Sequence, residues 1–66
     1  MTYRELRRMI EPVYGKDEAR AVTDYVLEVY FGLSRADVMC GAVEEMTAVH
    51  EAELLRIFAR LLDGEP

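Results

Sequence analysis

The sequence predicts an all-α fold, a small compact bundle of about four to five short helices. Apolar residues recur at spacings of three and four through most of the chain, as on one face of a helix. Residues that typically begin or end helices separate these stretches, and no stretch has a convincing strand pattern. With 66 residues the chain makes one small domain, whose core leaves little room for an enclosed catalytic cleft.

The first predicted helix follows Thr2. The spacing of Thr2 and Glu5 is that of a capping box, in which each side chain satisfies a backbone amide of the other residue. Pro12 lacks an amide hydrogen and is expected to bend or fray the end of this helix, which Gly15 finishes. The predicted apolar face comprises Tyr3, Leu6, Ile10 and Val13.

The second predicted helix has the broadest apolar stripe, so we expect it to be the central element. Asp17 is its expected N-cap and Gly32 its expected C-terminal cap. Tyr25 and Tyr30 lie on the stripe, which favours their burial in the core over a role in stacking against a ligand. The stripe comprises Ala19, Val22, Tyr25, Val26, Val29, Tyr30 and Leu33, with Leu27 to one side.

The segment that follows is less regular. Ser34 and Asp37 again have capping-box spacing, which predicts a short helical turn. We expect Val38 and Met39 to enter the core. Residues 42–46 fit either a short helix or an irregular link.

The last predicted helix has Thr47 as its N-cap, and Arg56 and Arg60 near its end, where cations are favoured. Its apolar residues cover more than one stripe, so part of this face is predicted to be exposed and available for dimerisation. These residues include Leu54, Leu55, Ile57, Phe58, Leu61 and Leu62.

Residue types that carry catalysis or bind metals are sparse. His50 is the only histidine and Cys40 the only cysteine, and no glycine-rich phosphate loop is present. The sequence therefore predicts no catalytic, cofactor-binding or metal-ligating residues. We expect His50 at the surface and Cys40 as a small apolar packing group.

Charge is distributed unevenly along a chain whose net charge is −5. Residues 1–35 hold six basic and six acidic side chains, whereas residues 36–66 hold two and seven. The acidic second half argues against a nucleic-acid partner, a helix-turn-helix DNA binder included, because neutralisation of phosphates dominates such binding. Without an apolar run that could span a membrane or serve as a signal peptide, we expect a cytoplasmic protein with no membrane partner.

Three arginines are the candidates for contact with a protein partner. The spacing of Arg4, Arg7 and Arg8 places them on one side of the first helix, away from Leu6 and Ile10. A solvated surface is the commoner reason for such arginines. Arginine is also enriched at protein interfaces, so this side of the helix is a candidate docking surface for an acidic partner.

Two stretches of the chain have a distinctive order of residues. Gly15 to Val38 reads GKDEARAVTDYVLEVYFGLSRADV, and residues 60–66 read RLLDGEP. Together with the leucine-rich helix between them, they resemble the N-terminal helical domain of the HemK/PrmC family of release factor glutamine N5-methyltransferases. Leu61 stands where many members carry a second basic residue, and residues 39–46 match only loosely.

The resemblance implies that residues 1–63 form a substrate-recognition domain and that residues 64–66 begin a linker to a catalytic domain. The parent enzyme would use S-adenosylmethionine to methylate the Gln of the Gly-Gly-Gln motif in peptide-chain release factors, its protein partners. By itself this chain would be neither an enzyme nor a binder of that cofactor. The alternative is a freestanding helical protein-interaction or dimerisation module.

Overall fold

The computed structural model describes residues 1–64, and within this range it contains four helices and no strand. This confirms the predicted all-α fold. Glu65 and Pro66, which belong to the predicted start of a linker, lie outside the described residues. The helices are α1 (Tyr3–Tyr14), α2 (Lys16–Phe31), α3 (Arg35–Met39) and α4 (Ala48–Leu62).

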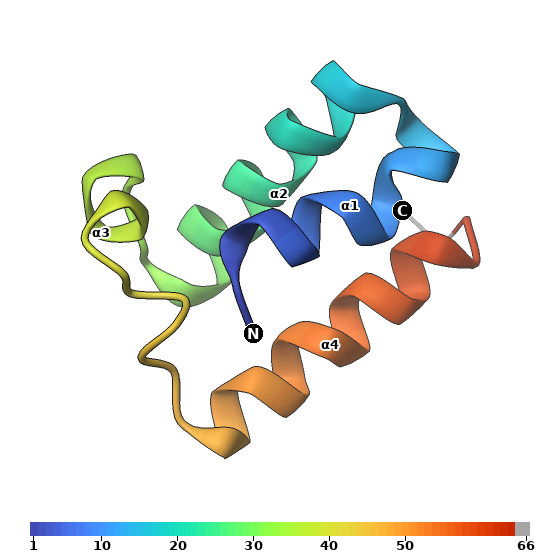
Figure 1. Ribbon diagram of the computed structural model, residues 1–66. Helices are drawn as coiled ribbons and strands as arrows, with labels where there is room; N and C mark the ends of the chain where they lie inside the picture. Colours follow the sequence, from blue (N-terminus) through green and yellow to red (C-terminus); the bar gives the residue numbers. More distant parts are fainter. Residues whose placement is uncertain (65–66) are drawn as a thin grey trace.

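The central element is α1. Figure 1 shows α1 between α2 and α4, with the short α3 at the far end of α2, and α1 packs against both long neighbours. The expectation that the second helix would be central is therefore wrong. The side of α2 that is turned away from α1 carries part of its apolar stripe into solvent, where Val29 is 56% exposed.

The core lies where α1, α2 and α4 meet. Leu6 and Ile10 of α1 are fully buried, as predicted, but Val13 at the end of the same face is half exposed. Val43, in the irregular link before α4, is also buried. The buried apolar set is Leu6, Ile10, Ala19, Val26, Leu27, Val43, Leu54 and Phe58.

Three predicted N-terminal caps are confirmed. The Glu5 amide donates to Thr2 Oγ1 at 3.1 Å, and the Thr2 amide donates to Glu5 Oε1 at 2.8 Å. Ser34 and Asp37 form the same reciprocal pair. Thr47 begins α4 by accepting a hydrogen bond from the amide of His50, as expected from its position.

A single residue, Gly15, joins α1 to α2. Its amide donates to the Glu11 carbonyl, and its own carbonyl accepts from the Ala19 amide, so it ends one helix and begins the next. Asp17 was expected as the N-cap of α2, but α2 begins before it, and Asp17 lies within the first helical turn. A carboxylate in the first turn still stabilises the helix through the helix dipole.

Pro12 does not fray the end of α1, which continues to Tyr14 and receives the Gly15 amide at the Glu11 carbonyl. Proline removes the one hydrogen bond that an amide at position 12 would donate to the carbonyl of residue 8. Pro12 lies on an exposed part of the helix.

Between α2 and α4, two expectations about burial are wrong. Met39 is 81% exposed and Cys40 is exposed, whereas Val38 packs against the core as predicted. Successive helical residues point about 100° apart, so the five-residue α3 cannot turn both Val38 and Met39 inward. Residues 40–45 form turns, which selects the irregular link over the short helix.

Candidate docking surface

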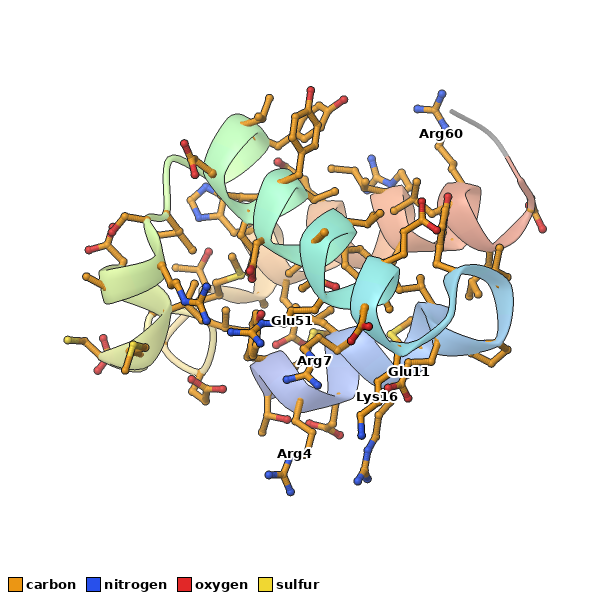
Figure 2. The ribbon with its side chains drawn as sticks, turned by 90° about the horizontal axis from the view of Figure 1, so that it is seen from above. Arg4, Arg7, Glu11, Lys16, Glu51 and Arg60 are labelled. Carbon is orange, nitrogen blue, oxygen red and sulfur yellow. The ribbon has the colours of Figure 1, made fainter. Side chains whose placement is uncertain are left out.

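Arg4, Arg7 and Arg8 line one open hollow on the outer side of α1. The hollow has a volume of about 450 Å³ and is completed by Glu11 and by Lys16 at the start of α2. Figure 2 shows Arg4, Arg7, Glu11 and Lys16 gathered on this side of the molecule, with Arg60 far from them. The structure thus brings the three sequence-predicted arginines together and adds a lysine to them.

Arg7 is the most constrained of these cations. Its guanidinium carbon lies 5.7 Å from the centre of the Tyr3 ring, within the range of a cation–π interaction. Its Nε atom is buried and has no hydrogen-bond partner among residues 1–64. Burial and the aromatic ring therefore hold this side chain in position, whereas Arg4 and Arg8 are exposed.

Tyr3 in turn is fixed by α2. Its hydroxyl donates a hydrogen bond to the carboxylate of Asp24. Burial of the phenol, reinforced by this hydrogen bond and by the charge of Asp24, raises the pKa of Tyr3 to about 12. Tyr3 therefore stays neutral at physiological pH and connects α1 to α2 beneath Arg7.

A second hollow, of about 350 Å³, lies on the other side of Arg7. Arg20 of α2 and Arg35 of α3 line it, together with Tyr3 and Asp24. Arg7 lines both hollows, so the cations form one continuous surface, which we name the basic band. The basic band consists of Arg4, Arg7, Arg8, Lys16, Arg20 and Arg35.

Sequence reasoning missed half of this band. Lys16, Arg20 and Arg35 lie on elements other than α1, so helical spacing along one element did not connect them with the first three arginines. A signal was present in the composition, because the first 35 residues contain six of the eight basic side chains. Those same six form the basic band.

The cations of the basic band make no ion pair with a carboxylate anywhere in residues 1–64. Within residues 1–64, an ion pair joins the Met1 ammonium to Glu51 at 3.9 Å and involves no cation of the band. Asp24, the carboxylate in the second hollow, already accepts from the Tyr3 hydroxyl. The charges of the band are therefore available to an outside group.

A different surface lies between α2 and α4. Tyr25 and Tyr30, predicted to be buried, are 63% and 62% exposed and border an apolar groove of about 170 Å³. Residues of both α2 and α4 line this groove. The groove is lined by Val22, Tyr25, Val26, Tyr30, Ile57, Arg60 and Leu61.

The apolar excess of the last helix is only partly exposed. Leu54 and Phe58 are fully buried, Ile57 and Leu61 are partly buried, and Leu62 is 39% exposed. Dimerisation through this face stays a prediction.

The remaining chemistry of the described chain is simple. His50 is exposed, as predicted, and its ring lies at 75° to that of Phe31, with 6.4 Å between the ring centres. Residues 1–64 contain no group of three or more potential metal ligands. In the same part of the chain, no helix has the length and apolar character needed to cross a membrane.

Comparison with known proteins found no family model, no curated protein and no solved structure that matches the chain.

Proposed function

We propose that this chain is the release-factor-recognition domain of an S-adenosylmethionine-dependent methyltransferase, which N5-methylates the Gln of the Gly-Gly-Gln motif in peptide-chain release factors. The observation that carries the proposal is the order of residues from Gly15 to Val38 and from Arg60 to Pro66, which resembles the HemK/PrmC family. The role of this chain in the reaction is to bind the protein substrate.

The residues of that resemblance have defined structural roles at the corner between α2 and α3. Gly32 adopts a left-handed conformation with φ 67°, and its amide donates to the Glu28 carbonyl at 3.0 Å. Two residues later, Ser34 caps α3. A helix therefore ends and the next helix begins within the stretch Phe31-Gly32-Leu33-Ser34-Arg35. This arrangement supports a fold shared with the family.

The surface features support recognition rather than chemistry as the role of this chain. Methyl transfer requires a cofactor and an acceptor held in a fixed attack geometry. Both hollows are open. The first is lined by charged side chains and the second by charged side chains together with Tyr3, Val38 and Met39, a mixture that suits contact with another protein.

The test is calorimetry with the 66-residue chain and two titrants, a purified release factor and S-adenosylmethionine. We expect saturable binding of the release factor and no heat from the cofactor. A release factor whose Gly-Gly-Gln motif is changed to Gly-Gly-Ala should bind almost equally well, because the chain recognises regions other than the methylated residue. Absence of release-factor binding, or clear cofactor binding, would contradict the proposal.

One observation favours a second candidate function, a freestanding dimerisation module. Tyr25 and Tyr30 expose aromatic rings beside an apolar groove, and such patches often mark contact sites. Sedimentation equilibrium separates the two candidates. A stable dimer that Tyr30→Ser dissociates favours the module, whereas a monomer that binds the release factor favours the recognition domain.

A further inference from the structure

We infer that the basic band binds an acidic segment of the protein partner, one that presents several carboxylates along an extended or helical stretch. This inference rests on the proposed function, according to which the acidic segment is part of the release factor. The inference goes beyond that function because it assigns the contact to one surface and specifies the chemistry of the partner.

Charge is the first support. Six basic side chains line the two hollows, against the two carboxylates of Glu11 and Asp24. The chain as a whole has a net charge of −5, so the band is a local exception on an acidic molecule. A complementary potential of this kind steers partners into position and fixes the register of a complex.

Geometry is the second support. The two hollows share Arg7, so a bound segment that passes from one hollow to the other meets cations in both. An arginine can form two parallel hydrogen bonds with one carboxylate, which makes a row of arginines selective for acidic side chains.

Rigidity is the third support. Gly15 joins α1 directly to α2, and Tyr3 connects the same two helices through Asp24. The backbone positions that carry the cations of α1 and α2 are therefore set before a partner arrives. A binding surface that is already ordered loses less conformational entropy when the complex forms.

The acidic remainder of the chain favours a peptide segment over a nucleic acid. A long polyanion would extend beyond the band and meet repulsion from an acidic surface, and the second half of the chain alone holds seven acidic side chains against two basic ones. A short acidic segment stays within the two hollows and avoids that repulsion.

The experiment measures binding of the release factor to three forms of the chain. The test variant is Arg4→Glu/Arg20→Glu, which reverses one exposed cation in each hollow. The control is Arg56→Glu, which reverses a single exposed cation of α4 outside the hollows. Circular dichroism confirms that each variant is folded.

We expect the test variant to bind at least about tenfold more weakly and the control to stay within about twofold of the unmodified chain. Affinity of the unmodified chain should fall steeply with salt. Equal binding by the test variant would overturn the inference and leave the proposed function intact.

A second arm uses a synthetic glutamate-rich peptide short enough to stay within the two hollows and a single-stranded oligonucleotide long enough to extend beyond them. If the release factor does not bind but the peptide binds and the test variant loses it, the proposed function fails and the basic band stands. Tighter binding of the oligonucleotide than of the peptide would overturn the inference. It would also be overturned if the chain bound neither the release factor nor the peptide.

Discussion

Tyr3 holds three segments of the molecule together. Its ring lies beneath Arg7 of α1, its hydroxyl donates to Asp24 of α2, and its backbone amide donates to Glu44 Oε2 at 3.0 Å. Glu44 belongs to the irregular link before α4, so one residue connects segments that are distant in sequence. The apolar pattern predicted that Tyr3 faces the core, but it contained no sign of these polar contacts.

Titration of Tyr3 should make stability depend on pH in alkaline solution. Its pKa is about 12 in the folded chain and about 10 in the unfolded chain, so folding favours the neutral phenol. This contribution is complete below pH about 10 and is lost as the pH rises towards 12. Urea midpoints measured across this range should fall more for the unmodified chain than for Tyr3→Phe.

Absorbance of tyrosinate provides an independent check on Tyr3. The Tyr3 phenol should ionise only as the pH approaches about 12, which gives an absorbance step that Tyr3→Phe should lack. An equal absorbance step near pH 12 in Tyr3→Phe would show that Tyr3 is not held as described.

Thr23 is a fully buried residue of α2 whose hydroxyl has no hydrogen-bond partner among residues 1–64. Valine has nearly the same shape and replaces the hydroxyl with a methyl group. We expect Thr23→Val to stabilise the chain by about 1 kcal/mol, because burial of an unpaired hydroxyl is unfavourable. Urea denaturation measures the change.

Thr23→Ser is the control for this prediction. It keeps the hydroxyl and removes the buried methyl group, so it should destabilise the chain. Destabilisation by Thr23→Val would mean that the hydroxyl does have an acceptor.

At the scale of the elements, two glycines separate α1, α2 and α3. Gly15 has φ 81° and ψ 167°, a region almost confined to glycine, and Gly32 has φ 67° and ψ 22°, in the left-handed helical region. A Cβ atom at either position would have no atom within 4 Å, so the cost of a side chain is purely one of backbone conformation.

We expect Gly15→Ala to lower the free energy of unfolding by about 1–3 kcal/mol and Gly32→Ala by about 1–2 kcal/mol. Asparagine tolerates the left-handed helical region, so Gly32→Asn should cost less than Gly32→Ala. Thermal denaturation followed by circular dichroism ranks the three variants. A loss well below about 1 kcal/mol for Gly15→Ala would contradict the assigned geometry of this corner.

Element boundaries were predictable where a local hydrogen bond determines them. Thr2, Ser34 and Thr47 cap helices through contacts within three residues, so sequence spacing is sufficient to identify them. The start of α2 was not predictable in this way. Asp17 is a good N-cap by residue type, but Gly15 serves both neighbouring helices and leaves no place for another cap.

At the scale of the whole molecule, the limit of sequence reasoning is the position of each helix relative to the others. The stripe of α2 is broad, but only the part that faces α1 and the core is buried, which leaves Tyr25 and Tyr30 exposed. For the same reason, Arg4, Arg7 and Arg8 were predictable as a group from one helix, whereas Arg20 and Arg35 join them only through tertiary packing.

Stability should reflect this observed burial rather than the apolar pattern. Tyr30→Ser alters a residue that is 62% exposed and should change the free energy of unfolding by less than about 0.5 kcal/mol. Phe58→Ala removes a fully buried ring and should cost about 3–5 kcal/mol, comparable with the whole stability of so small a core.

Circular dichroism at 25 °C distinguishes these outcomes, since the Phe58 variant should be largely unfolded and the Tyr30 variant fully helical. A large loss of helix in Tyr30→Ser would indicate that this tyrosine is covered in solution, as in a dimer.

The one-residue joint between α1 and α2 also bears on the kinetics of recognition. No flexible linker between α1 and α2 has to become ordered on binding. A partner that collides in the right orientation therefore meets two helices that already hold their relative positions. Arrival should then be fast and set by diffusion in the electric field of the surface, and competing partners should be distinguished by how long each remains attached.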